Sequence, residues 1–185
     1  IVARIPVGST AAPVVRLAAN DTAVWALQDF KLAAVKIDPT TNKVTGSAPL
    51  CPAGECRVGD LAVGNGRTWA VNCCAGEVSE IDPATLAVRT NARLGRAVWY
   101  LAGSSDQVWA LNHDTGQLAR LEPNGEKPAS EIETGAKPAS SFTFGAGSLW
   151  FYDRATSEIL RVSTDQGSIA ARIKAAGVTA LAVSG

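Results

Sequence analysis

Few side chains in this sequence have types and spacing that could do chemistry, and His113 is the first of them. It is the single histidine among 185 residues, and it stands between Asn112 and Asp114. Acid–base catalysis by a histidine requires a nucleophile or a second titrating partner within reach. No nucleophile is identifiable beside His113 in the sequence, so we rate it a weak catalytic candidate. We therefore favour a non-catalytic protein over an enzyme, and we predict no cofactor.

The four cysteines are the second reactive group, at Cys51, Cys56, Cys73 and Cys74. An even number of thiols fits disulfides in an oxidising compartment. A bond between the adjacent Cys73 and Cys74 would join Cα atoms only about 3.8 Å apart, which is shorter than usual for a bridge. Crossed bonds to the Cys51/Cys56 loop are therefore favoured, with a strained vicinal bridge as the alternative. A zinc site is a third possibility, but Cys-x4-Cys matches structural zinc knuckles poorly, and we predict no metal.

These groups are positioned by an internal repeat. Four tryptophans each precede an Ile, Leu or Val by twelve residues, and they are spaced 44, 40 and 41 residues apart: Trp25, Trp69, Trp109 and Trp150. Around each tryptophan, apolar and polar residues alternate between turn residues, which is the pattern of strands and hairpins, and there is no helical period. Four-stranded units that repeat at about 40 to 45 residues are typical of propeller blades. The repeated tryptophans are expected to pack between blades.

We therefore predict an all-β chain, a β-propeller of four-stranded antiparallel blades forming one domain over residues 1–185. The four complete blades are expected at about residues 13–50, 57–95, 97–135 and 138–177. Residues 2–8 match the fourth strand of a blade and residues 178–183 match the first, so one orphan strand is expected at each end. Two such strands would lie three strand spacings apart in a shared blade. We expect an incomplete ring, part of five to eight blades, completed by further polypeptide or by a second chain.

The repeats differ from one another at one end of the expected blades. There, the loops from the fourth strand to the next first strand meet the loops from the second strand to the third, and we call this end the variable face. Loops on a rigid scaffold commonly carry function, although solvated loops around a water-filled channel would vary as well. The candidate ligand-binding residues are Arg16, Asp29, Asp60, Trp99, Tyr100, His113 and Arg154. The four cysteines are expected in two neighbouring loops of the same face.

Two further sets of residues need an explanation. Trp99 has Val15, Gly59 and Ser140 as its counterparts in the other units. It either offers an aromatic surface at the channel or fills space left by small neighbours. Acidic residues precede the turns at the opposite end and are expected to hydrogen-bond within them: Asp38, Asp82 and Glu122.

Composition excludes some partners. Seventeen basic and seventeen acidic residues cancel, so the chain has no electrostatic signature of nucleic-acid binding. The longest apolar runs fall well short of the roughly 20 residues that cross a bilayer. We expect no nucleic acid as a partner and no membrane span in this segment.

The segments ARIPVG, APVVRLAAN, AVWAL and KIDPTTNKV resemble the YVTN-type and streptogramin-lyase-like propellers of bacterial secreted proteins. The resemblance implies a propeller in an extracellular, cell-surface or periplasmic-type oxidising location. Streptogramin lyases are understood to use histidines with an acidic metal ligand, and only His113 could correspond to them here. We predict a non-catalytic sensor or scaffold domain that binds a protein, peptide or glycan on the variable face. The alternatives are a lyase-like enzyme using His113 with Asp60 or Asp114, and a half-propeller that assembles through its open edges.

Overall fold

The computed structural model describes residues 3–7, 13–28, 33–50, 58–72 and 75–183, and within these ranges the regular structure is entirely β. The first sheet contains β1 (Val14–Ala19), β2 (Val24–Gln28), β3 (Ala33–Asp38) and β4 (Lys43–Pro49). The second contains β5 (Val58–Gly64), β6 (Arg67–Asn72), β7 (Glu77–Ile81) and β8 (Val88–Arg93). The third contains β9 (Val98–Gly103), β10 (Val108–Asn112), β11 (Gln117–Leu121) and β12 (Ser130–Glu133). The fourth contains β13 (Pro138–Gly145), β14 (Ser148–Asp153), β15 (Glu158–Ser163) and β16 (Ser168–Lys174).

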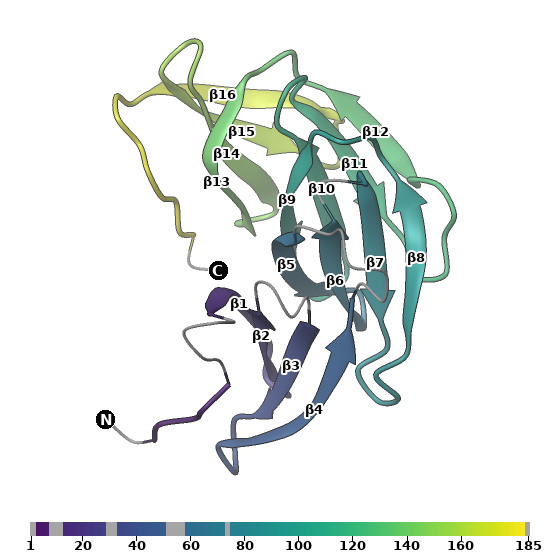
Figure 1. Ribbon diagram of the computed structural model, residues 1–185. Coiled ribbons are helices and arrows are strands. Elements are labelled where there is room, and N and C mark those ends of the chain that lie inside the picture. Colours follow the sequence, from purple (N-terminus) through teal and green to yellow (C-terminus); the bar gives the residue numbers. More distant parts are fainter. Residues whose placement is uncertain (1–2, 8–12, 29–32, 51–57, 73–74, 184–185) are drawn as a thin grey trace.

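Each sheet is an antiparallel meander in chain order, so each is one propeller blade. The innermost strands β1, β5, β9 and β13 contact one another in succession, and the four blades form an arc (Figure 1). The predicted all-β fold with four-stranded antiparallel blades is confirmed. We number the blades 1 to 4 in chain order.

The predicted orphan strands differ in detail from the structure. Residues 3–7 and 175–183 run as irregular chain without strand pairing, and they lie in the opening of the arc between blades 1 and 4 (Figure 1). A β-strand needs a neighbour for its backbone hydrogen bonds. Neither terminal segment has second and third strands beside it among the described residues, so neither forms a ladder.

The repeated tryptophans define two sides of every blade. We call the side that carries the tryptophan the forward face and the other side the backward face. Trp25 and Leu27 on the forward face of blade 1 share a core cluster with Leu61, Ala70 and Ile81 on the backward face of blade 2. Blade 2 packs on blade 3, and blade 3 on blade 4, through clusters of the same kind. The predicted role of the tryptophans between blades is confirmed for the first three, whose exposed fractions are 1%, 0% and 1%.

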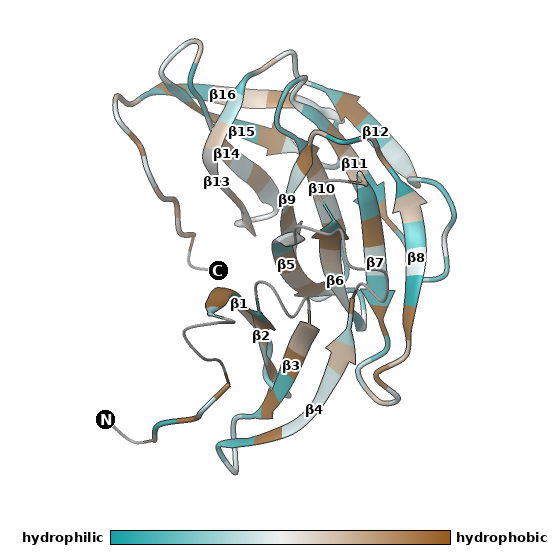
Figure 2. Cartoon of the chain, viewed as in Figure 1, coloured by the Kyte–Doolittle hydropathy of each residue, from teal (hydrophilic) through white to brown (hydrophobic). Residues whose placement is uncertain are grey.

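Hydrophobic residues concentrate on the inner strands of the arc, whereas outer strand β8 carries hydrophilic positions (Figure 2). This gradient follows from the packing, because the inner and middle strands of blades 2 and 3 have a neighbouring blade on each side. A β-bulge also recurs where the first strand of each blade pairs with the second. In blade 3, Val98 pairs with Asn112 and Tyr100 with Leu111, so Trp99 is the extra residue. Bulges of this kind redirect side chains.

The acidic residues at the opposite end behave as predicted in two of three cases. Asp38 accepts the backbone N–H of Thr40 at 2.7 Å, and Asp82 accepts those of Thr85 at 3.0 Å and of Ala84 at 2.8 Å. These bonds hold the pKa of each carboxyl below its ordinary value. The prediction for Glu122 was wrong, because its carboxylate accepts a hydrogen bond from Asn65 of blade 2 at 3.1 Å and pairs with the neighbouring Arg120. A glutamate side chain is one methylene longer, so it reaches past its own turn.

Candidate functional site

The two kinds of loop on the variable face are joined by backbone hydrogen bonds. In blade 3, the N–H of His113 donates to the carbonyl of Ala97 at 2.7 Å. In blade 4, the N–H of Arg154 donates to the carbonyl of Lys137 at 3.0 Å. Each bond ties a loop that enters a blade to the turn between its second and third strands. The side chains at His113 and Arg154 therefore project from a fixed backbone.

The structure brings Trp99 and His113 together. Their rings stack with centroids 5.4 Å apart and planes 25° from parallel. Trp99 is 46% exposed, and Nδ1 of His113 lies 2.9 Å from the carboxylate oxygen of Asp114. We call these three side chains the aromatic platform. It combines an open aromatic surface with a hydrogen-bonded polar edge.

A strip of polar groups continues the platform toward blade 4. Lys137 Nζ donates to the backbone carbonyl of Asp114 at 2.5 Å, and the backbone N–H of Lys137 donates to the carboxylate of Asp153 at 3.0 Å. Arg154 follows next in the chain, with an exposed side chain. The predicted residues Trp99, His113 and Arg154 of blades 3 and 4 thus belong to one continuous surface. Sequence reasoning missed Lys137, although a basic residue follows the loop glycine in both Gly95-Arg96 and Gly135-Ala136-Lys137.

The residue just before each of these turns has a structural role. The side-chain oxygen of Asn112 accepts the N–H groups of Asp114 and Thr115 at 2.9 and 3.1 Å. Asp153 is 2% exposed and accepts N–H from Ala155 at 3.0 Å. Asn and Asp commonly organise turns in this way. The side chains of Asn112 and Asp153 are therefore explained by turn formation, and in these two blades the side chains available to a ligand are those one residue later, His113 and Arg154.

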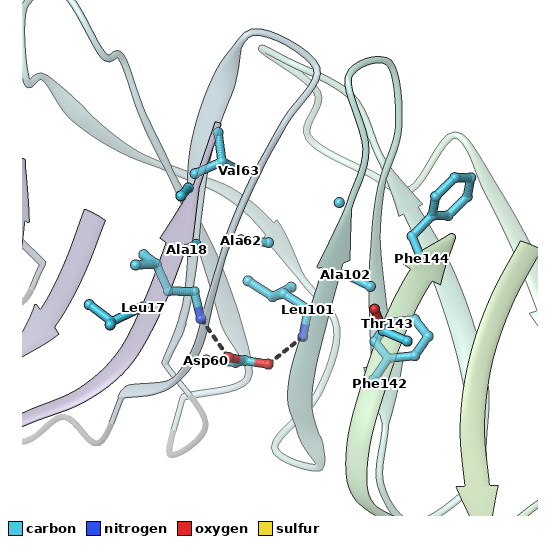
Figure 3. A pocket seen from close by; sticks show the side chains of 13 residues that line it. Leu17, Ala18, Asp60, Ala62, Val63, Leu101, Ala102, Phe142, Thr143 and Phe144 are labelled. Atoms are coloured by element: carbon cyan, nitrogen blue, oxygen red, sulfur yellow. Dashed lines mark hydrogen bonds between the residues drawn. The ribbon is translucent and has the colours of Figure 1, made fainter. Parts of the chain in front are cut away.

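Arg16 and Asp60 form a second part of the candidate site, at the inner strands. Their side chains meet with 3.4 Å between Arg16 Nε and Asp60 Oδ1, and Arg16 is 49% exposed whereas Asp60 is 15% exposed. The Asp60 carboxylate also accepts the backbone N–H groups of Leu61 at 2.9 Å and of Leu101 at 3.0 Å (Figure 3). Asp60 therefore links β5 to β9. Burial raises its pKa above the ordinary value, against the opposing effects of the two backbone N–H groups and of Arg16.

Asp60 stands at the wall of a cavity of about 290 Å³ that all four inner strands line. Leu17, Ala62, Leu101 and Phe142 are among the residues around it (Figure 3). Trp99 is not among the described lining residues, so its exposed ring belongs to the variable face and not to this channel. Tyr100 turns the other way and packs, partly buried, against the core between blades 3 and 4.

Several predicted residues cannot be placed. Asp29 and all four cysteines, Cys51, Cys56, Cys73 and Cys74, lie outside the described residues. The disulfides therefore remain a prediction. In the described part of the chain, no three His, Cys, Asp or Glu side chains gather as a set of metal ligands. The same residues include no helix long and apolar enough to cross a membrane.

Comparison with solved structures supports the fold. The chain is similar to a streptogramin B lyase, with a TM-score of 0.60 and 12% identity over 96% of this chain and 74% of the lyase. It is also similar to hydrazine synthase from Kuenenia stuttgartiensis (TM-score 0.69, 12% identity, 91% of this chain and 51% of that one). A third similar structure is apo AztD from Citrobacter koseri (TM-score 0.64, 13% identity, 89% and 47%).

The likeness extends to the fold alone. No protein-family model matches the sequence, and no curated protein matches it. The chain spans about three quarters of the lyase and about half of the other two structures. Another similar structure, PorZ of Porphyromonas gingivalis, is described as a bacterial surface component of the type-IX secretion system, at 14% identity and TM-score 0.62 over 90% of this chain and 21% of that one. These proteins differ widely in function and share the architecture, so the chain has the streptogramin-lyase-like β-propeller fold.

Proposed function

We propose that this chain is a non-catalytic binding module that holds a protein, peptide or glycan on its variable face. The observation that carries the proposal is the aromatic platform, where Trp99 keeps 46% of its surface exposed while stacking on His113. An exposed tryptophan beside charged groups is a common anchor in binding surfaces. The cost of ordering it on binding is small, because stacking and the bulge already fix its direction.

The charges around the platform narrow the kind of ligand. Asp114, Lys137 and Arg154 place one carboxylate and two cations along the strip, and the whole chain is neutral. Such a mixed edge suits a ligand that offers both hydrogen-bond donors and acceptors beside an apolar face. A sugar ring and a short peptide both meet this description. We propose an extracellular or cell-surface location, in line with the surface component among the similar structures.

Binding to arrays of oligosaccharides and of short peptides tests this function. We expect ligands that bind the native chain to lose at least about tenfold in affinity with Trp99→Ala, since a central aromatic anchor contributes about 2 kcal/mol or more. The matched control is Asp165→Ala, an exposed carboxylate in the turn between β15 and β16 at the opposite end. If both variants bind every ligand equally well, the assignment to the aromatic platform fails.

The lyase-like alternative rests on one observation, the 2.9 Å contact between His113 and Asp114. A carboxylate can orient an imidazole for proton transfer. Turnover of a streptogramin by the native chain, lost in His113→Ala and kept in Trp99→Ala, would favour this alternative. The binding module predicts no turnover in any of the three proteins.

A further inference from the structure

The two ends of the blade arc carry interface surfaces that the described residues cover only in part. Three of the four large hydrophobic side chains that are most exposed among the described residues lie there, namely Leu17, Val44 and Ile173. The fourth is Trp99 of the aromatic platform. Exposed apolar groups that gather on particular faces mark interaction sites.

The backward face of blade 1 can be compared with its counterparts inside the arc. Leu17 pairs with Ala26 in the register that Leu61, Leu101 and Phe142 repeat in the other blades. The exposed fraction of Leu17 is 67%, whereas those of its three counterparts are 4%, 4% and 9%. Each of the three counterparts has a preceding blade packed against it, whereas no blade precedes Leu17 among the described residues. Leu17 therefore has the chemistry of a residue that a preceding blade should cover.

The forward face of blade 4 shows the same difference. Ile173 occupies the position of Ala48, Ala92 and Ile132, each opposite the third strand of its blade. Those three are 0%, 1% and 5% exposed, and Ile173 is 45% exposed. Trp150 is likewise only partly buried, although its counterparts Trp25, Trp69 and Trp109 are fully buried.

The terminal segments cover these faces incompletely. Residues 178–183 lie along β13, where Leu181 N–H donates to Ser141 Oγ at 2.9 Å and Val183 lies against Gly145. Ile5 and Val7 pack on the backward face of blade 1 beside Val35 and Ile37. None of the described residues in 3–7 or 178–183 is buried. These segments therefore hold little contact area and can be displaced by a partner that fits better.

We propose that the chain of 185 residues pairs with a second copy of itself, joined head to tail so that the two copies close an eight-bladed ring. Each forward face inside the arc packs on the backward face of the next blade. In the ring, blade 1 of the second copy would cover the forward face of blade 4, and blade 4 of the second copy would cover the backward face of blade 1. Val44 corresponds to Val88 and Ile173 to Ala48, and Val88 and Ala48 belong to the same core cluster between blades 1 and 2. Val44 of one copy is thereby placed near Ile173 of the other. A closed ring also leaves no end face free to bind a third copy, so the assembly stops at two copies.

Light scattering during size-exclusion chromatography tests the proposal. We expect the native chain to have twice the monomer mass of 19.1 kDa. Val44→Glu and Ile173→Lys, each alone, place one charge in both interfaces of the ring and should give monomers. The control Thr90→Glu adds the same charge as Val44→Glu to an exposed position of β8 in a middle blade and should leave the dimer intact.

Mixing the two monomeric variants gives the sharpest result. In a head-to-tail ring, one interface then has native Val44 and Ile173. The other interface pairs the carboxylate introduced by Val44→Glu in one copy with the ammonium introduced by Ile173→Lys in the other. The mixture should therefore recover the dimer mass. A native chain that stays monomeric, a dimer that tolerates both single substitutions, a mass that keeps growing with concentration, or a mixture that stays monomeric would each overturn the proposal.

Discussion

At the scale of single residues, Asp60 has the most unusual environment of the predicted site residues. Its carboxylate is largely buried between β5 and β9, yet it accepts two backbone N–H groups and lies 3.4 Å from Arg16. Burial is the largest influence, so the pKa of Asp60 is raised in the folded chain. The folded state thus binds a proton more readily than the unfolded state, in which the pKa is near 3.8. This contribution to stability is complete below pH 3.8 and is lost as the pH rises through the folded pKa.

The corresponding prediction concerns the difference in unfolding free energy between the native chain and Asp60→Asn. Asparagine cannot ionise, so this difference should move against the native chain as the pH rises from about 3.8 through the raised pKa. Urea titrations at several pH values measure it. Thr143→Val, an uncharged change in the wall of the same cavity, should show a difference that stays level with pH. A level difference for Asp60→Asn would mean that Asp60 is not desolvated.

Single residues also show how far the sequence could predict the site. Trp99, His113 and Arg154 were identified because they vary on an otherwise repeated scaffold, and the structure brings the first two into contact. Their stacking could not be predicted, since it depends on the bulge at Trp99 and on the bond from His113 N–H to Ala97. The pairing of Arg16 with Asp60 was missed for a related reason. It joins two blades, and the repeat period says nothing about pairs that only one interface contains.

At the scale of blades and strands, the tryptophan repeat predicted the architecture because the same packing recurs at each of the three interfaces between the described blades. The repeat could not predict the buried Glu80, which is 3% exposed and contacts Arg67 and Asn91 at 3.0 and 2.9 Å. It also accepts the N–H of Asn124 from blade 3 at 2.8 Å. Its counterparts are Lys36, Arg120 and Arg161. Glutamate therefore occupies a position where the other blades have a cation.

The blades also predict unequal costs for equivalent substitutions. Trp109→Ala removes a ring that is 1% exposed between blades 3 and 4, and such large-to-small changes in cores cost about 3 to 5 kcal/mol. Trp150→Ala removes the matching ring from the partly open forward face of blade 4, where Arg161 lies 5.6 Å from its centroid. We expect a clearly smaller loss of unfolding free energy. Urea denaturation compares the two losses when each substitution is made in Val44→Glu chains, which are monomeric under the ring proposal. Equal losses would show that the forward face of blade 4 is covered to the same extent as that of blade 3.

At the scale of the whole molecule, stability should vary along the arc. Blades in a repeat architecture are stabilised chiefly by their immediate neighbours, and blades 2 and 3 are packed on both faces by the described clusters. Blades 1 and 4 each have one face that terminal segments cover only in part. Local opening should therefore cost less free energy in the end blades than in the middle blades.

Hydrogen exchange followed by mass spectrometry measures this gradient and connects it to the ring. In monomeric Val44→Glu, amides of β2 and β14 should exchange faster than those of β6 and β10, because the end blades open without disturbing the middle of the arc. In the native chain at concentrations that favour the dimer, a second copy would cover both end faces, so protection of β2 and β14 should rise toward that of the middle strands. Protection that is uniform in the monomeric variant would contradict the neighbour-by-neighbour account of stability. A gradient that persists in a native dimer would instead place the dimer contact away from the two end faces.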